Sequence, residues 1–254
     1  MLIYQNTNFY FFWKPHGLAS SFGNEKSFLD YIFYQKEKLP NNFISYQDID
    51  KDTLVYIKDQ INSLNLEPVL DTQSQSEIIQ NLIKNFDKEN EYGLLNRLDN
   101  DTSGFLYFAK DASIYHEYKI KQADGLFTKY YIAQVKGNPF YKSDKKEMDI
   151  DYPIMHHKFA SDRMVCIKQD SDLAKGSGKE HMVSSKISLL SFDKSKNIST
   201  LLISISKGIR HQIRVHLSSI GCPIIGENIY SNDKSKDFLH LRSVGFIFKH
   251  QKNK

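Results

Sequence analysis

The run 96–104, Asn-Arg-Leu-Asp-Asn-Asp-Thr-Ser-Gly, places an arginine and two carboxylates, Arg97, Asp99 and Asp101, in a short polar turn. The residues that follow, Phe-Leu-Tyr-Phe-Ala at 105–109, predict a buried strand. A carboxylate presented from a turn beside a rigid strand can act as a nucleophile or as a base. Taken alone, the run also fits an ordinary loop with a solvated aspartate.

Three other segments match, in the same order along the chain, the motifs of one enzyme family. They are Lys-Pro-His-Gly-Leu at 14–18, Lys-Tyr-Tyr-Ile-Ala at 129–133, and 208–230, which contains Gly-Ile-Arg-His-Gln-Ile-Arg-Val-His-Leu and Gly-Cys-Pro-Ile-Ile-Gly-Glu. With 96–104 they resemble the RluA-like pseudouridine synthases, whose motifs are Lys-Pro-x-Gly, His-Arg-Leu-Asp-x-x-Thr-Ser-Gly, Lys-x-Tyr-x-Ala, and His-Gln-Ile-Arg-Val-His followed by Gly-x-Pro-Ile-x-Gly-Asp. Four ordered matches favour the catalytic interpretation of the polar turn.

The chain departs from the family pattern in four places. Asn96 stands where the motif usually has His, and Glu227 stands where it usually has Asp. Arg210 comes one place later than the family's arginine, and the gap between Gly17 and Arg97 is longer than in the family. None of these changes removes the carboxylate, so they bear on the choice of RNA more than on the chemistry.

The resemblance implies isomerisation of uridine to pseudouridine in RNA, with Asp99 as the catalytic group and Asp101 as a solvated or turn-capping residue. Tyr131 matches the tyrosine on which the flipped pyrimidine stacks. Arg214 matches the arginine that pairs with the catalytic carboxylate, and such a partner is useful because burial alone favours the neutral acid. Whether Asp99 acts as nucleophile or base stays open.

Five further residues are predicted to bind the substrate: Arg97, Lys207, Arg210, His211 and Gln212. Arg97 resembles the arginine that fills the space left by the flipped base, and its alternative role is a salt bridge that caps the backbone. If 210–220 is one helix, Arg210 and Arg214 share a face, so that one enters the site and the other meets phosphate. Arg210 fits a plain surface arginine equally well.

The sequence contains no glycine-rich phosphate loop, no dinucleotide-binding fingerprint and no Cys/His cluster with zinc spacing. This agrees with the reaction that the resemblance implies, in which a C–N glycosidic bond breaks, the uracil turns and a C–C bond forms without redox chemistry. We therefore expect no cofactor and no metal. The first residues carry no signal-peptide pattern, and the apolar run 9–13 is too short to span a bilayer. With only two cysteines, a cytoplasmic protein without a membrane partner is expected.

Positive charge concentrates at the end of the chain. Residues 200–254 hold nine lysines and arginines against three acidic residues, an excess of +6 in a chain whose formal net charge is +4. This basic excess includes the His-Gln-Ile-Arg segment, which is typical of a face that contacts phosphates. The expected partner is therefore RNA, either ribosomal or transfer RNA; the lysines at 249–254 fit a frayed tail.

The predicted elements give an α+β fold with a mostly antiparallel mixed sheet and flanking helices. Strands are expected at 9–13, 105–109, 127–135, 186–192, 200–206 and 239–248, and helices at 27–34, 76–88, 111–123 and 210–220. Residues 41–74 read as a polar, irregular, family-atypical insert, with a local element at 54–57. We expect one monomeric catalytic domain over 1–254, without the N-terminal RNA-binding domain that many relatives carry.

Two other functions share some of these sequence features. A catalytically inactive RNA-binding relative would keep the basic segment but lose the carboxylate, and the presence of Asp99, Tyr131 and Arg214 together argues against it. A metal-free N-glycosidase would share the first half of the chemistry but not the four ordered motifs. A pseudouridine synthase forms pseudouridine in the RNA, whereas an N-glycosidase releases free uracil, so detecting the product separates these two enzymes.

Overall fold

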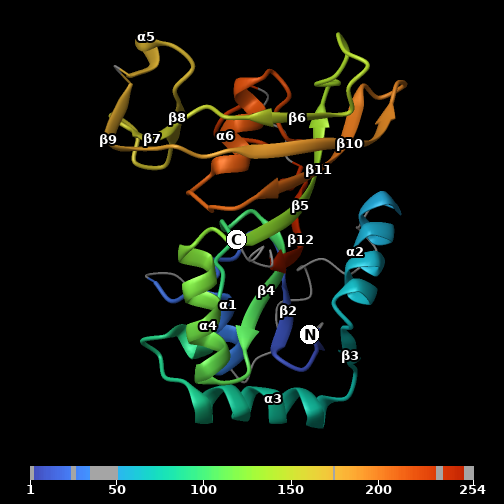
Figure 1. The fold of residues 1–254 in the computed structure, drawn as a ribbon, viewed down its shortest axis with the longest axis vertical. Helices are drawn as coiled ribbons and strands as arrows, with labels where there is room; N and C mark the ends of the chain where they lie inside the picture. Colours follow the sequence, from blue (N-terminus) through green and yellow to red (C-terminus); the bar gives the residue numbers. More distant parts are fainter. Residues whose placement is uncertain (1–2, 24–26, 35–50, 174, 233–236, 249–254) are drawn as a thin grey trace, which may run out of the picture. The chain divides into compact units, whose positions relative to one another are not determined.

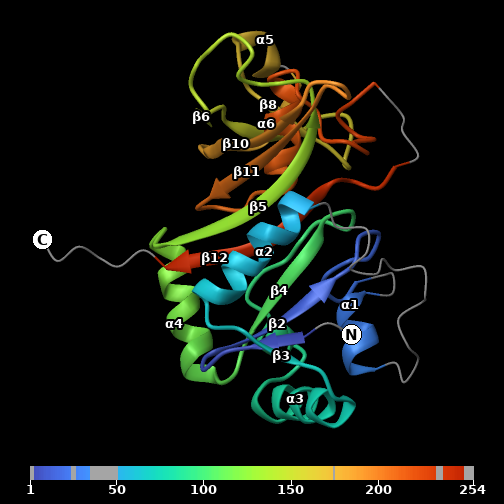
Figure 2. The ribbon, with the colours of Figure 1, turned by 90° about the vertical axis from the view of Figure 1, so that its right-hand side faces the viewer.

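The computed structural model describes residues 3–23, 27–34, 51–173, 175–232 and 237–248. The chain divides into two compact units, each shown in Figures 1 and 2. Unit 1 comprises Met1–Asp124 and Arg242–Gly245, and unit 2 comprises Gly125–Leu241 and Phe246–Lys254. Both units combine helices with mostly antiparallel strands, so the predicted α+β class is confirmed.

Unit 1 is built on strands in the order β3-β1-β2-β4, with part of β12 beside β4. Its strands are β1 (Ile3–Gln5), β2 (Phe9–Lys14), β3 (Glu67–Val69) and β4 (Ser103–Ala109), and β12 spans Leu241–Phe248. Its helices are α1 (Phe28–Phe33), α2 (Lys51–Ser63), α3 (Thr72–Asn85) and α4 (Ala112–Ala123), with a short 3₁₀ turn, η2 (Glu91–Gly93). The β4–β12 pair is parallel, and the other pairs of this unit are antiparallel.

The centre of unit 1 is aromatic because β2 and β4 are buried on both faces. Phe11 is fully buried and makes edge-to-face ring contacts with Phe105 and Tyr107. At the start of β4, Gly104 has φ +116°, and a Cβ there would lie 2.2 Å from the backbone oxygen of Ser243. Only glycine permits this close approach, so the final residue of the motif run 96–104 is required where β4 meets β12.

Unit 2 contains strands in the order β5-β11-β10-β6 and a separate three-stranded sheet in the order β8-β7-β9. These strands are β5 (Phe127–Lys136), β6 (Glu147–Ile150), β7 (Ile154–His157), β8 (Met164–Cys166), β9 (Gly176–His181), β10 (Ser185–Asp193) and β11 (Ile198–Ile205). Two helices accompany them, α5 (Asp170–Leu173) and α6 (Gln212–Ser219), and α6 contacts β8 and β10. The small sheet was not foreseen from the sequence.

Several predicted elements are confirmed, together with the side chains that begin them. Ser27 caps α1 through a capping box with Asp30. Asp111 caps α4 by accepting from the Ile114 N–H at 2.9 Å. The strands expected at 186–192 and 200–206 are β10 and β11, which form a hairpin, and Asp193 Oδ1 accepts the Ser195 N–H at 2.9 Å within its turn.

Two sequence predictions are wrong in the described part of the chain. The stretch 41–74 is not irregular from Lys51 onward, because it forms α2 and β3, and β3 pairs with β1; residues 41–50 lie outside the described residues. The helix expected over 210–220 begins at Gln212 instead. His211 has the left-handed φ of +53°, which a right-handed helix cannot contain, so Arg210 is not part of α6.

Candidate active site

Asp99 lies in the tight turn that enters β4. The turn is closed by the Thr102 N–H donating to the Asp99 carbonyl at 3.0 Å, and the Leu18 N–H donates to the Asn100 carbonyl at 3.1 Å. The Asp99 side chain is half-buried, whereas Asp101 is exposed. The two carboxylates therefore differ in exposure.

Lys14 holds this turn from within unit 1. Its side chain is fully buried, and Nζ donates to the carbonyls of Pro15 at 2.8 Å, Leu18 at 2.7 Å and Asn100 at 3.0 Å. Burial lowers the pKa of Lys14 to about 7, against the opposing charges of Asp101 and Asp99. The Lys-Pro-x-Gly motif thus has a structural role: it ties the end of β2 to the backbone beside Asp99.

Asn96 and Ser20 fix the other side of the turn. Asn96 Oδ1 accepts the Tyr107 N–H at 2.8 Å and Nδ2 donates to the Phe105 carbonyl at 3.3 Å. Ser20 Oγ donates to the Leu98 carbonyl at 2.8 Å and accepts the Leu98 N–H at 2.9 Å. The residue that replaces the family's histidine is therefore buried and holds the turn against β4.

Arg97 has an exposed side chain that pairs with Glu91. Its Nε lies 3.2 Å from Oε2 and its Nη2 lies 3.1 Å from Oε1 of that carboxylate, with 69% of the Arg97 side chain exposed. This salt bridge joins two side chains, whereas the alternative role expected from the sequence was a salt bridge that caps the backbone. An exposed pair of this kind is weak, so it does not prevent Arg97 from leaving Glu91 for a bound RNA.

Tyr131 lies on β5, opposite Ile203 of β11. It is buried, with 6% of its surface exposed, whereas the neighbouring Tyr130 is half-buried. Successive residues of a strand point to opposite faces of the sheet, so the two tyrosines cannot serve the same pocket. The strand predicted for this segment is confirmed.

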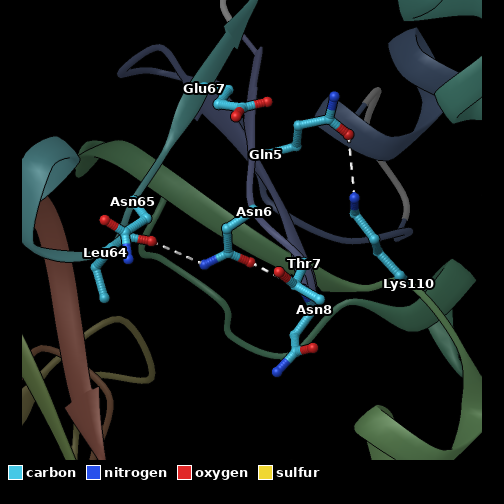
Figure 3. A pocket seen from close by; sticks show the side chains of 8 residues that line it. All are labelled: Gln5, Asn6, Thr7, Asn8, Leu64, Asn65, Glu67 and Lys110. Carbon is cyan, nitrogen blue, oxygen red and sulfur yellow. Dashed lines mark hydrogen bonds between the residues drawn. The ribbon is translucent and has the colours of Figure 1, made fainter.

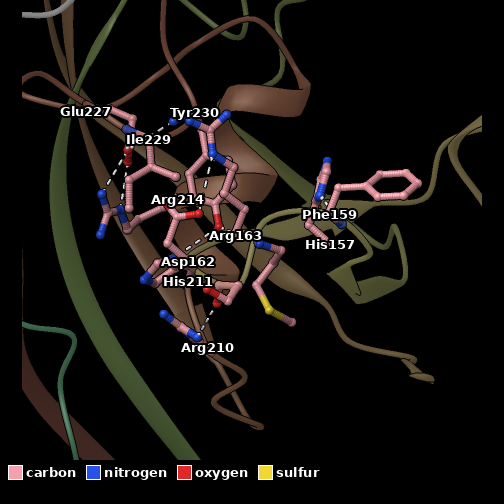
Figure 4. A network of polar contacts seen from close by, with 12 residues as sticks. His157, Phe159, Asp162, Arg163, Arg210, His211, Arg214, Glu227, Ile229 and Tyr230 are labelled. Carbon is pink, nitrogen blue, oxygen red and sulfur yellow. Dashed lines mark hydrogen bonds and ion pairs between the residues drawn. The ribbon is translucent and has the colours of Figure 1, made fainter. Parts of the chain in front are cut away.

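Arg214 on α6 forms a buried double hydrogen bond with Glu227. Nε donates to Oε2 and Nη2 donates to Oε1, each at 2.8 Å, and the two side chains are 2% and 0% exposed (Figure 4). Burial by itself raises the pKa of Glu227, but the Arg214 guanidinium and the N–H groups of Ile229 and Tyr230 outweigh it and hold that pKa below its usual value. The pair therefore stays ionised and fixes the guanidinium in place.

Tyr230 and His211 extend this cluster. The Tyr230 hydroxyl accepts the Met164 N–H at 2.8 Å and lies 2.8 Å from His211 Nδ1, while the Arg214 guanidinium lies 5.9 Å from the Tyr230 ring centroid (Figure 4). His211 is thus hydrogen-bonded to Tyr230. The contacts connect the start of α6 with β8.

Gln212 and His216 join α6 to the strand β10. Gln212 Nε2 donates to Ser185 Oγ at 3.2 Å, and His216 lies 2.9 Å from Ser185 Oγ through Nδ1 and 2.8 Å from the Tyr152 carbonyl through Nε2. Burial lowers the pKa of His216, so the ring is neutral near neutral pH. Because a carbonyl only accepts, Nε2 carries the proton and Nδ1 accepts from the Ser185 hydroxyl. Both residues therefore position α6.

The predicted phosphate-contacting residues are exposed. Lys207 follows β11, and Arg210 donates through Nη1 to the Ser161 carbonyl at 3.0 Å. Of the nine basic residues after position 199, five lie outside the described residues (Lys234, Lys236, Lys249, Lys252 and Lys254). The basic residues of 200–254 that the structure describes are therefore Lys207, Arg210, Arg214 and Arg242, and Arg214 is neutralised by Glu227.

A polar cavity of about 510 Å³ lies in unit 1, and none of the predicted site residues lines it (Figure 3). It is lined by the β1–β2 turn, the segment between α2 and β3, and Lys110. Asn6 Nδ2 donates to the Leu64 carbonyl at 3.1 Å and Lys110 Nζ donates to Gln5 Oε1 at 3.1 Å, so much of its polar lining is satisfied internally.

Two general properties of the described residues bear on the site. They contain no group of three or more His, Cys, Asp or Glu side chains placed to hold a metal ion. None of the helices in this part of the chain combines the length and the apolar character that a membrane span requires.

Two features of unit 2 were not foreseen from the sequence. Glu227 stood out only as a departure from the family motif, and no local pattern marks it as the partner of Arg214, which precedes it by thirteen residues. The turn between β7 and β8, which carries the exposed Phe159, was not singled out. No local residue pattern marks this turn, because its contacts with Arg210 and Tyr230 join segments that are 49 and 66 residues apart in the chain.

Comparison with known proteins identifies what the chain is similar to. The family model described as RNA pseudouridylate synthase matches residues 8–219. A Helicobacter pylori protein named "Uncharacterized RNA pseudouridine synthase" is 29% identical over 219 residues, covering 84% of this chain and 78% of that protein. "Ribosomal large subunit pseudouridine synthase D" of Buchnera aphidicola is 28% identical over 204 residues, covering 78% of this chain and 59% of that protein. "Ribosomal large subunit pseudouridine synthase C" of Rickettsia bellii is 27% identical over 213 residues, covering 77% and 64%.

Solved structures support the fold. The structure titled "Human RNA Pseudouridylate Synthase Domain Containing 1" matches with a TM-score of 0.58 at 15% identity, over 95% of this chain and 75% of that one. "Human RNA Pseudouridylate Synthase Domain Containing 4" matches with a TM-score of 0.55 at 19% identity, over 96% and 82%.

Proposed function

The chain belongs to the RNA pseudouridylate synthase family, and from that premise we propose that it isomerises a uridine of ribosomal RNA with Asp99 as the reacting carboxylate. Asp99 stands at the motif's aspartate, on a turn that Lys14, Ser20 and Asn96 hold by hydrogen bonds. A turn held in this way can present one carboxylate in a fixed position, which is the requirement for a nucleophile or a base. This turn is the observation that carries the proposal.

The proposed reaction is an isomerisation, so its atoms balance without a co-reactant. The bond between C1′ of the ribose and N1 of the uracil breaks, the base turns, and C1′ bonds to C5, while C5 loses the proton that N1 gains. The target nucleotide has to leave its stack before the carboxylate can approach the sugar. Asp99 then acts on the sugar or the base as nucleophile or as base, and both roles need it ionised.

Arg214 and Tyr131 are proposed to assist Asp99 on the same nucleotide. The buried Glu227 holds the Nε–Nη2 edge of Arg214, and a guanidinium has five N–H groups, so the same arginine can serve a second carboxylate. Tyr131 offers an aromatic face for the flipped base. Lys207, Arg97, Arg210, His211 and Gln212 are proposed to contact or position the RNA.

The proposal is tested by mapping pseudouridine in total RNA from cells with and without the gene. The expected result is one or more uridines of ribosomal RNA that lose the modification without the gene and regain it when the gene is restored. Ribosomal RNA is proposed because relatives bear the names of large-subunit enzymes. Loss of the modification only in transfer RNA would show that the substrate is transfer RNA rather than ribosomal RNA. Release of free uracil without pseudouridine would show an N-glycosidase, and no change in any RNA would contradict the proposed activity.

Replacing Tyr131 by alanine is expected to lower the single-turnover rate far more than replacing Tyr130, because base stacking on an aromatic ring contributes about 1–3 kcal/mol. Tyr131→Phe keeps the ring and should retain most of the rate. Since Tyr131 is buried, thermal unfolding of each variant is measured alongside. Tyr131 would be assigned to the core if Tyr130→Ala lowered the single-turnover rate more than Tyr131→Ala does. The same conclusion would follow if the lower rate of Tyr131→Ala were explained by a lower unfolding temperature.

A further inference from the structure

The turn between β7 and β8 presents one aromatic side chain to solvent. Phe159 is 78% exposed, and its ring points away from the Arg214–Tyr230 cluster (Figure 4). Single exposed apolar residues are common on protein surfaces, so exposure alone assigns nothing. What distinguishes Phe159 is the number of hydrogen bonds that hold the turn carrying it.

The backbone around Phe159 is fixed from both sides. The His157 N–H donates to the Arg163 carbonyl at 3.1 Å, the Phe159 N–H donates to His157 Nδ1 at 3.1 Å, and the Arg163 N–H donates to the Ala160 carbonyl at 3.2 Å. The Lys158 N–H donates to the Lys175 carbonyl at 2.8 Å, next to β9. The ring is therefore presented on an ordered turn.

Two residues of the candidate active site also hold this turn. Arg210 donates to the Ser161 carbonyl at its tip, at 3.0 Å, and the Tyr230 hydroxyl accepts from the Met164 N–H at its base, at 2.8 Å. Tyr230 lies against Arg214 and His211. The turn is thus connected to the start of α6 by two bonds between segments that are distant in the chain.

One cation lies against the exposed ring, and two more belong to or contact the turn that carries it. The Lys158 ammonium lies 5.4 Å from the Phe159 ring centroid, Arg163 ends the turn, and Arg210 donates to the Ser161 carbonyl within it. One carboxylate, Asp162, lies 3.8 Å from Arg163 in a weak exposed pair. An aromatic face among cations matches an unpaired nucleotide, whose base stacks while its phosphate meets positive charge.

We propose that the 158–163 turn is a second RNA contact, in which Phe159 stacks on an unpaired base and Arg210 acts by holding the turn rather than by binding phosphate. This inference rests on the proposed action on RNA and deepens it, because it names an unpaired nucleotide as part of the substrate. Arg210 is then a positioning residue.

The test compares binding of a fluorescently labelled RNA of about 12 nucleotides, within the length that one binding groove covers, as a single strand and annealed to its complement. Phe159→Ala should weaken binding of the single strand about tenfold, the effect of one lost stacking contact, with little change for the duplex. Phe159→Tyr should restore it. Tyr141→Ala is the matched control, because Tyr141 is 72% exposed and has the Lys142 ammonium 5.1 Å from its ring centroid; it should bind as the wild type does.

The salt dependence of binding and a double variant, Phe159→Ala with Arg210→Ala, show whether Arg210 holds the turn or binds phosphate. A lost phosphate contact flattens the slope of log affinity against log salt by about one, as expected for Lys207→Ala. Arg210→Ala should weaken single-strand binding as Phe159→Ala does without changing that slope, and the double variant should be no weaker than either. An additive loss with a flatter slope would show that Arg210 binds phosphate and would overturn its holding role.

The stacking contact would be overturned if Phe159→Ala bound the single strand as tightly as the wild type does. It would also be overturned if the variant lost the same affinity for the single strand and the duplex. If Phe159 contacts a partner other than RNA, the first of these results is expected. Pseudouridine formation by the same preparations is followed on ribosomal RNA from cells lacking the gene. If the wild type forms none while the Phe159 effect persists, the proposed function fails and the RNA contact stands. If pseudouridine forms but Phe159 has no effect, only the RNA contact fails.

Discussion

Asp99→Asn is expected to abolish pseudouridine formation, lowering the single-turnover rate by at least about 10³-fold, the scale for removing a group that takes part in bond making. The amide keeps the shape of the side chain but can act neither as nucleophile nor as base. The bonds that hold the turn use the backbone of Leu98, Asp99 and Asn100 and not the carboxylate. Folding and RNA binding should therefore remain close to those of the wild type.

Asp101→Asn is the matched control, two residues along the same turn. Asp101 is exposed, and its replacement should leave most of the rate intact. Rates are measured with enzyme in excess over ribosomal RNA, and circular dichroism of both variants checks the fold. If both variants lost the same fraction of the single-turnover rate, the reaction would depend on the negative charge of the turn rather than on one reacting carboxylate. An active Asp99→Asn variant would contradict the assignment of Asp99.

Glu227→Ala is expected to lower the free energy of unfolding by about 3–5 kcal/mol, the cost of leaving a buried charge without its partner. Both side chains of the Arg214–Glu227 pair are almost fully buried, and the carboxylate also accepts the N–H groups of Ile229 and Tyr230. The reaction should slow as well, because Arg214 loses the group that orients it. Urea unfolding followed by circular dichroism, which reports on both units, measures the stability.

The control is Glu147→Ala, which removes an exposed pair with Lys186 at 2.7 Å in the same unit. Exposed pairs contribute little, so its unfolding curve should nearly overlay that of the wild type. A similar small change in Glu227→Ala would mean that unit 2 does not depend on the buried pair.

The same pair predicts how stability depends on pH. The pKa of Glu227 is lower in the folded protein than its ordinary value of 4.5, so the unfolded chain binds the proton first as the pH falls. The stabilisation is fully present above 4.5 and is lost as the pH falls through the folded pKa. Glu227→Gln should lose this part of the acid sensitivity, and an unchanged pH profile would contradict it.

The family, the α+β class and most local elements could be predicted from the amino-acid sequence alone. Alternation and aromatic runs marked β2, β4 and β5, and Ser27 and Asp111 marked the starts of α1 and α4. These signals are local, since a cap or an alternating pattern depends on residues only a few places apart. The order of four short motifs supplied the candidate residues Asp99, Tyr131 and Arg214.

Tertiary structure decided what those residues touch. It paired Arg214 with Glu227, began α6 only after His211 so that Arg210 lies outside the helix and donates to Ser161, and gave Lys14 three carbonyl partners. It also made α2 and β3 from a stretch that looked irregular, because β3 is completed by pairing with β1. Each of these depends on packing and hydrogen bonds between segments distant in the chain, such as the 66 residues that separate Met164 from Tyr230, and no local pattern of residue types encodes such partners.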